Sequence, residues 1–171
     1  MSAVAQESLN PDSTTHIHEI YIKAEAAAIW DALTRPEWTS RYGYRALSNY
    51  ELKPGGKFRC LANEQMKQMG LPELIIDGEV IEVKPPHKLV QSYRFLFNEA
   101  HVKEGFTRIT WEVVPTGKGF CRVTVTHDTG GAPMMSGATQ SKFNEQGGGG
   151  WNWILSDLKS LLETGKTMGA A

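Results

Sequence analysis

A single long amphipathic helix is predicted near the C-terminus, and it limits the fold more than any other segment. Apolar residues recur there with the i, i+3, i+4, i+7 spacing of one helix face. Gly165 follows as a typical helix end, with Lys166 well placed for the helix dipole. Because such a broad stripe must be buried, the rest of the chain has to supply an apolar surface for it. The stripe comprises Trp151, Ile154, Leu155, Leu158, Leu161 and Leu162.

The helix is preceded by four consecutive glycines, residues 147–150, and carries two tryptophans in its first turn. A glycine inside a helix costs about 1 kcal/mol relative to alanine, so we expect regular helix from about Trp151 onward. The glycines are then interpreted as a flexible joint. Trp151 lies on the apolar stripe and should pack toward the sheet. Trp153 lies about 200° around the helix, so we expect it to be partly exposed, or buried against the preceding loop or another subunit.

Most of the remaining chain is predicted to form an antiparallel sheet. Residues 16–23 alternate between two faces, the pattern typical of a strand. A helix over 24–33 and a shorter one from Pro36 through Trp38 and Tyr42 follow. Turn-rich, short connections then favour hairpins, which makes the chain an α+β protein with about seven strands. The predicted strands are residues 16–23, 44–52, 57–62, 74–83, 89–97, 106–114 and 119–128.

Two longer connections contain methionines. Residues 62–74 carry Met66 and Met69, and residues 129–143 carry Met134 and Met135. Methionine suits surfaces that adapt to varied apolar shapes, and long loops in compact domains are often functional. Both segments are therefore candidate lids over a pocket, with an unstructured loop as the alternative.

Composition excludes several classes of partner. The 171 residues suit one domain, and a formal charge of −1 without a basic run argues against nucleic acid or an anionic membrane as partner. No apolar stretch reaches the roughly 18–20 residues of a membrane span. Residues 1–14 lack the features of a signal peptide and are expected to be a disordered leader, while 166–171 should be a flexible tail. The expected compartment is the cytoplasm, where Cys60 and Cys121 would be buried thiols rather than a disulfide.

Nucleotide, cofactor and metal motifs are not supported by spacing. The segment "TGKT" (164–167) has Ser160 where a phosphate-binding loop needs glycine, and it ends a helix rather than starting one. The glycines at 147–150 do not follow the dinucleotide-binding pattern either. His16 and His18 share one strand face, but no cluster of further ligands completes a metal site. We therefore expect neither a cofactor nor a metal.

Three polar residues are weak candidates for acid or base chemistry. His127 ends a strand just before a methionine-containing loop, and histidine titrates near neutral pH. Glu79 and Arg94 lie within predicted strands that could border a pocket. The alternatives are a hydrogen-bonded strand-end histidine and solvated charges on a sheet face. Catalytic residues are otherwise unknown, because the chain contains no G-x-S-x-G sequence.

A curved sheet that packs on one helix tends to leave a concave apolar space, which suits a small molecule. Aromatic side chains, methionines and one leucine of the helix stripe are expected to line that space. The candidate ligand-binding residues are Trp38, Tyr42, Phe58, Met66, Met69, Tyr93, Phe95, Trp111, Met134, Trp151 and Leu155.

Five segments in order resemble one known family. They are "IWDALTRPEWTSRY", "PGGKFR", "GEVIEVKPPHKLVQSYRF", "TRITWEVVP" and "GGWNWILSDLKSLLE". Over residues 16–165 the chain resembles the START-like (SRPBCC) superfamily, in the branch of the homologues of the activator of the Hsp90 ATPase. The resemblance implies one helix-grip domain over 15–165, in which the sheet wraps the C-terminal helix around an internal cavity.

Three functions are compatible with this resemblance. The first is a soluble protein that binds a small apolar or aromatic molecule between sheet and helix. The second is a cyclase- or hydrolase-like enzyme acting on a polyketide-like substrate, which requires Glu79, Arg94 or His127 to converge on the bound molecule. The third is a co-chaperone-like module for a protein partner, or for a second copy in a homodimer, and it requires an exposed apolar patch.

Overall fold

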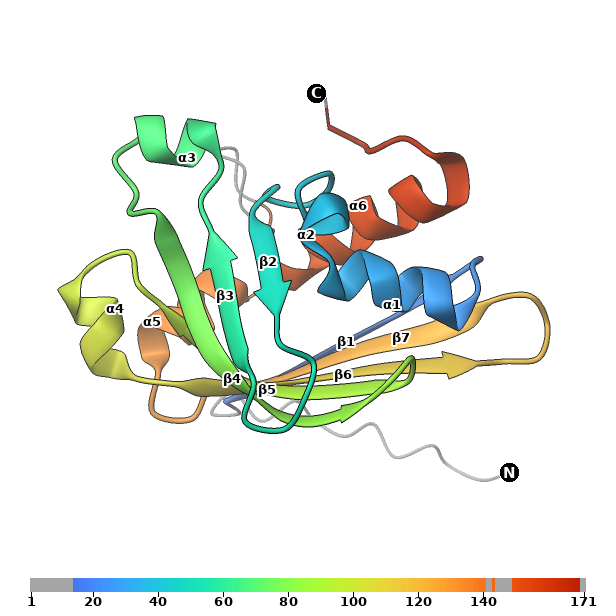
Figure 1. Ribbon diagram of the computed structural model, residues 1–171, viewed down its shortest axis with the longest axis horizontal. Helices are drawn as coiled ribbons and strands as arrows, with labels where there is room; N and C mark the ends of the chain where they lie inside the picture. Colours follow the sequence, from blue (N-terminus) through green and yellow to red (C-terminus); the bar gives the residue numbers. More distant parts are fainter. Residues whose placement is uncertain (1–13, 141–142, 144–148, 170–171) are drawn as a thin grey trace, which may run out of the picture.

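The computed structural model describes residues 14–140, 143 and 149–169. Seven antiparallel strands form one continuous sheet in the order β1-β7-β6-β5-β4-β3-β2 (Figure 1). All seven strands predicted from the sequence are present. Their bounds are β1 Thr15–Ile22, β2 Leu47–Tyr50, β3 Lys57–Leu61, β4 Leu74–Lys84, β5 Lys88–Phe95, β6 Thr107–Pro115 and β7 Cys121–Asp128.

The first strand joins the last one rather than its neighbour in sequence. In β1, Ile22 is opposite Cys121 of β7, and Thr15 is opposite Asp128. Strands β2 to β7 pair with their neighbours in sequence, and β2 lies at the far edge beside β3. Both edges of the sheet are thus formed by strands from the N-terminal third of the chain, on either side of α1 and α2.

The sheet is strongly curved (Figure 1). The pairing shifts register between Cys60 and Leu61 and again between Val80 and Glu82. Irregularities of this kind bend a strand and increase its twist. In β4, a Cβ atom at Gly78 would lie only 2.0 Å from the carbonyl oxygen of Ser92, so no other residue fits without a shift of the backbone. The concave side produced by this bend faces the helices.

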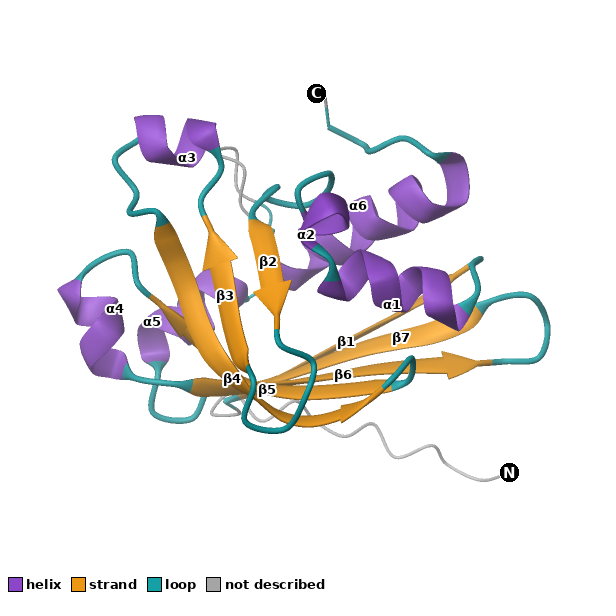
Figure 2. Cartoon of the chain, viewed as in Figure 1, coloured by secondary structure: helices purple, strands orange, loops and turns teal. Residues whose placement is uncertain are grey.

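The C-terminal helix α6 and the paired helices α1 and α2 cover the concave side of the sheet (Figures 1 and 2). Four residues of the stripe expected on α6 are buried, with Leu155 and Leu158 completely inaccessible, and Ile154 and Leu162 are partly buried against the same core. Gly165 ends this helix in a left-handed conformation, as the sequence indicated. The helices are α1 Ala26–Thr34, α2 Pro36–Thr39, α3 Glu64–Gln68, α4 Glu99–Glu104, α5 Pro133–Thr139 and α6 Gly150–Thr164.

Three short helices lie in connections that the sequence did not resolve. The two methionine-containing segments include α3 and α5, and α4 joins β5 to β6. Asn63 and Asn98 cap α3 and α4 by accepting hydrogen bonds from the backbone N–H groups of Met66 and His101. Such caps favour helix formation, but five or six residues are too few to display a helical period.

The two tryptophans of the first turn separate as predicted. Trp151 is buried in the main core, while Trp153 is half-buried and donates a 3.3 Å hydrogen bond to the carbonyl oxygen of Gly43. Gly147 and Gly148 lie outside the described residues, so the predicted joint is not tested there. Gly150 has a φ of 53°, and a Cβ atom on it would lie 2.4 Å from the carbonyl oxygen of Thr139. This glycine therefore permits a close approach between α5 and α6.

Part of the segment after α6 is hydrogen-bonded to the helix, while residues 170–171 of the expected tail lie outside the described residues. Asp157, buried in α6, accepts hydrogen bonds from the backbone N–H of Met168 at 2.7 Å and of Gly43 at 2.9 Å. Its carboxylate thereby fixes both the tail and the loop after α2 to the helix. The predicted leader, apart from Thr14, lies outside the described residues. In the described part of the chain no helix has the length and apolar character needed to span a bilayer.

Candidate functional site

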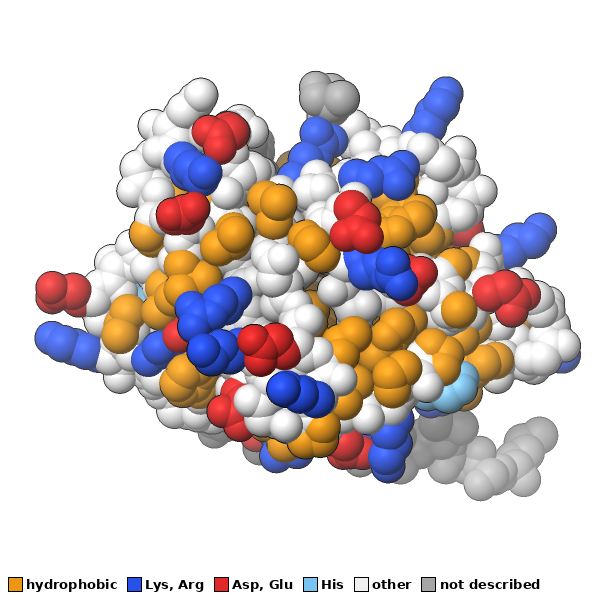
Figure 3. Space-filling model, in the orientation of Figure 1, with side chains coloured by type: hydrophobic (Ala, Val, Ile, Leu, Met, Phe, Trp, Pro, Cys, Tyr) orange, Lys and Arg blue, Asp and Glu red, His pale blue; other side chains and the backbone are white. Residues whose placement is uncertain are grey.

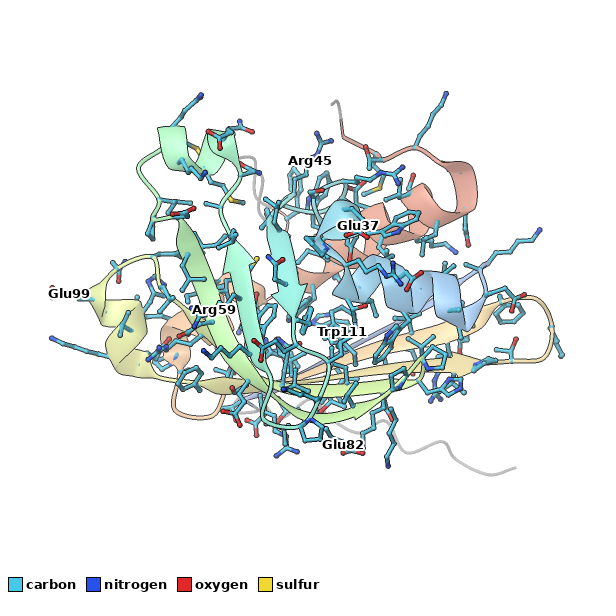
Figure 4. The ribbon with its side chains drawn as sticks, viewed as in Figure 1. Glu37, Arg45, Arg59, Glu82, Glu99 and Trp111 are labelled. Atoms are coloured by element: carbon cyan, nitrogen blue, oxygen red, sulfur yellow. The ribbon has the colours of Figure 1, made fainter. Side chains whose placement is uncertain are left out.

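A cavity of about 330 Å³ lies between the concave face of the sheet and the N-terminal half of α6. Its walls come from the strands β2 to β6, the loop after α2, and the facing ends of α5 and α6. In Figure 4, Trp111 lies in the space between the sheet and the covering helices. Arg45 lies near the top of the same view, among the loops. The cavity therefore occupies the position that the helix-grip hypothesis predicted.

Seven of the eleven expected ligand-binding residues line this cavity. The rings of Trp111 and Trp151 meet edge to face at 5.4 Å, and those of Tyr50 and Phe58 stack at 4.5 Å. Aromatic pairs in these geometries make a rigid apolar wall. The seven residues are Tyr42, Phe58, Met66, Tyr93, Phe95, Trp111 and Trp151.

The other four expected residues lie elsewhere. Trp38 packs against the main core from α2, with the guanidinium of Arg41 4.7 Å from its ring. Leu155 is completely buried in the core one turn after Trp151. Met69 and Met134 are 69% and 41% exposed. Met69 and Met134 do not line the cavity, because α3 and α5 direct the neighbouring methionines, Met66 and Met135, toward the core instead.

One polar pair in the cavity wall was not anticipated. Gln91 of β5 is only 1% exposed, and its Oε1 atom accepts a 2.8 Å hydrogen bond from the hydroxyl of Tyr50. The signal was present in the sequence, because alternation along β5 places Gln91 on the same face as Tyr93 and Phe95. Cys60 also lines the cavity, and burial raises the pKa of its thiol to about 11.

His127 is fully buried and held between two partners. The indole N–H of Trp151 donates to its Nδ1 atom at 3.1 Å, and its Nε2 atom lies 2.7 Å from the hydroxyl of Thr107. That hydroxyl in turn donates to the carbonyl oxygen of Tyr93 at 3.0 Å. Because an indole can only donate, Nδ1 must accept and Nε2 must carry the proton, so this network holds a neutral imidazole. Burial, reinforced by His16, lowers the pKa of His127 to about 4.

The three residues considered for acid and base chemistry do not meet. His127 lies behind Trp151 and does not line the cavity. Arg94 projects from the opposite face of the sheet, where it forms a two-pronged ion pair with Asp77 at 3.0 and 2.7 Å. Its guanidinium also lies 4.2 Å from the ring of Phe106. Glu79 is exposed on the same strand as Asp77. The convergence required by the enzyme hypothesis is thus not formed.

His16 and His18 face inward from β1, where each forms a hydrogen bond with another side chain of the protein. The Nε2 atom of His16 lies 2.9 Å from the hydroxyl of Ser136, and Nδ1 of His18 lies 3.0 Å from the side-chain oxygen of Asn152. Within the described ranges, no group of three or more histidine, cysteine or acidic side chains is arranged to hold a metal ion.

Loops from distant parts of the chain meet beside the cavity. Asn63, which caps α3, also donates to the carbonyl oxygens of Tyr44 at 3.3 Å and Arg45 at 3.2 Å. Tyr44 and Arg45 line the cavity, as do Ala138 and Thr139 of α5.

On the face shown in Figure 3, acidic, basic and hydrophobic side chains are interspersed.

A curved antiparallel sheet that wraps a C-terminal helix around an apolar cavity defines the helix-grip class of the START-like (SRPBCC) superfamily. A family model described as "Activator of Hsp90 ATPase homolog 1-like protein" matches residues 23–163. The chain therefore belongs to that family. Comparison with curated protein sequences gave no match.

Solved structures share the fold at low sequence identity. An Hsp90 activator from Plasmodium falciparum is 20% identical, with a TM-score of 0.52 over 91% of each chain. The Aha1 dimer from Colwellia psychrerythraea is 18% identical, with a TM-score of 0.57 over 89% of this chain and 98% of that one. CalU16 from Micromonospora echinospora, in solution, is 17% identical with a TM-score of 0.61 over 91% of this chain and 69% of that one.

Proposed function

We propose that this protein binds a small apolar or aromatic molecule in the cavity between its sheet and α6. The observation that carries the proposal is a cavity of about 330 Å³ walled by aromatic side chains. Ligand sites usually have volumes of about 300–1,000 Å³, and an apolar cavity of about 150 Å³ accepts a benzene molecule. A ligand with two or three fused rings matches the size of this space.

The wall has the composition expected of a binding site rather than of a packing defect. Tyr93, Trp111 and Trp151 present ring surfaces, and few polar atoms interrupt them. A sealed core would have filled such a volume, because each missing methylene group lowers stability. The space is instead bordered in part by segments from four separate connections.

Calorimetric titration with fluorene, a rigid three-ring hydrocarbon, tests the proposal. Ala46 lines the cavity, and an Ala46→Phe substitution should fill part of it and weaken binding at least about tenfold. Ala100 on α4 is exposed, so Ala100→Phe is the matched control and should leave binding unchanged. Native mass spectrometry of the purified protein would reveal a retained ligand. Failure of fluorene to bind, together with no retained ligand, would refute the proposal.

A co-chaperone-like function is the second candidate, and one observation favours it. Val102, Phe106 and Met134 are 40%, 51% and 41% exposed around α4 and α5. The side chain of Glu104 links these helices by accepting from the backbone N–H of Met134 at 2.6 Å. If this patch binds an Hsp90 chaperone, Phe106→Ser should abolish stimulation of the chaperone's ATPase, whereas Ala46→Phe should not affect it. No stimulation by the unaltered protein would remove this candidate.

A further inference from the structure

We infer that the cavity selects aromatic molecules carrying a buried hydrogen-bond acceptor, above all a carbonyl oxygen, and that Gln91 and Tyr93 bind this oxygen. The inference rests on the proposed function and specifies the chemistry of its ligand. It depends on the polar atoms of the cavity wall rather than on its volume.

The side-chain amide of Gln91 is oriented by Tyr50. Its Oε1 atom accepts the 2.8 Å hydrogen bond from the hydroxyl of Tyr50, and the amide nitrogen points away from that hydroxyl. Among the described residues the nitrogen has no hydrogen-bond partner, although the side chain is 1% exposed to solvent and borders the cavity. Because this nitrogen faces the cavity, a hydrogen-bond acceptor on a bound molecule would give it a partner.

The hydroxyl of Tyr93 provides a second group on the same wall. Tyr93 lies two residues after Gln91 on β5, so both side chains project from one face of the strand. Its ring is fixed between neighbours, with Phe58 at 6.0 Å and Trp151 at 6.3 Å. No described residue accepts from or donates to its hydroxyl, and burial raises the pKa of this group, which keeps it protonated and able to donate.

The sign of the charges near the cavity supports an acceptor rather than a cationic ligand. No aspartate or glutamate lines the cavity in the described residues, and the charged residue that does is Arg45. Burial raises the pKa of Tyr42 and of Tyr50, so both hydroxyls stay neutral and cannot balance the charge of a buried ammonium group. Burial of an unpaired cation would be strongly unfavourable in this setting.

The size of the cavity then restricts the molecule. A volume of about 330 Å³ accommodates two or three fused rings with one substituent. With rings stacked against Tyr93 and Trp151, a carbonyl on the ring edge can reach the wall formed by β5. The expected ligand class is therefore a compact polycyclic aromatic ketone or a closely related carbonyl compound.

The test compares 9-fluorenone with fluorene, which share one ring system and differ by a carbonyl in place of a methylene group. We expect the protein to bind fluorenone at least about tenfold more tightly by calorimetric titration. Gln91→Met, which keeps the shape but removes the donor, should reduce this ratio to about twofold, because fluorenone loses a hydrogen bond that fluorene never makes. Fluorene binding by the variant also reports that it retains its cavity.

Tyr93→Phe gives a second, independent variant that keeps the ring and removes the hydroxyl, and it should reduce the preference for fluorenone in part. Equal affinity of the unaltered protein for both compounds would overturn the polar assignment and leave apolar binding intact. Retention of the full preference by both variants would show that other groups bind the oxygen. Absence of binding by either compound would overturn the proposed function itself.

Discussion

The indole nitrogen of Trp151 donates a 3.1 Å hydrogen bond to Nδ1 of His127, across a separation of 24 residues in the chain. The contact ties the first turn of α6 to the end of β7, directly behind the cavity wall. It also fixes the protonation state of a histidine that the sequence presented as a candidate acid or base. The stability of the fold should therefore depend on this contact and on the packing around it.

Protonation of His127 should destabilise the fold at acid pH. The pKa in the folded protein is lowered to about 4, below the ordinary value of 6.5, so the unfolded state takes up the proton first. The contribution to the unfolding free energy is therefore intact above pH 6.5 and falls by roughly 3 kcal/mol as pH decreases to 4. Urea denaturation at pH 7 and pH 4.5 measures the loss. In His127→Gln the difference between the two pH values should shrink; an unchanged difference would contradict the assignment.

Substitution of the two tryptophans should have unequal effects on stability. Trp151→Phe leaves Nδ1 of buried His127 without its donor and removes ring volume next to Trp111, so we expect a loss of about 3 kcal/mol. Trp153→Phe is the matched control, because its half-buried ring makes only a 3.3 Å bond to Gly43, and should cost about 1 kcal/mol or less. Denaturant unfolding compares the two. Similar losses would mean that Trp151 does not anchor α6 more firmly than Trp153 does.

Two glycine-to-alanine substitutions should change stability in opposite directions. At Gly150 the left-handed backbone and the approach to Thr139 both exclude a methyl group, so Gly150→Ala should destabilise the protein by about 2 kcal/mol or more. Gly137 lies within α5, and open space surrounds the position that a Cβ atom would take, so Gly137→Ala should be neutral or stabilising by up to about 1 kcal/mol. Thermal unfolding distinguishes them. An unchanged unfolding temperature for Gly150→Ala would contradict the close packing of Gly150 against Thr139.

Cys60 should be unreactive while the protein is folded. Its pKa of about 11 leaves very little thiolate at pH 8, and the side chain is 3% exposed. In a Cys121→Ser background, labelling by an aromatic disulfide reagent should be at least about a hundredfold slower than in urea. Labelling at the rate of a free thiol would indicate that the cavity opens readily to solvent.

Local sequence patterns were sufficient for the elements that depend on backbone geometry. Strand alternation predicted the strand over residues 16–23, and helical spacing separated buried Trp151 from half-buried Trp153. These patterns worked because burial on one face is repeated every two or 3.6 residues, and several residues in a row carry the same information. Short helices such as α3 and α4 were not predicted, because they span less than two turns and show no helical period.

The sequence by itself determined the strands, the principal helices and the apolar faces that they bury, and its resemblance pointed to the family. Only the tertiary structure decided which polar groups meet. It joined Arg94 to Asp77 on the outer face, enclosed His127 between Thr107 and Trp151, and brought Tyr50 to Gln91 across the curved sheet. These partners are 17 to 41 residues apart in sequence, and their contact depends on sheet register and curvature. Periodicity records which side of an element is buried, but not which side chain from another element lies there.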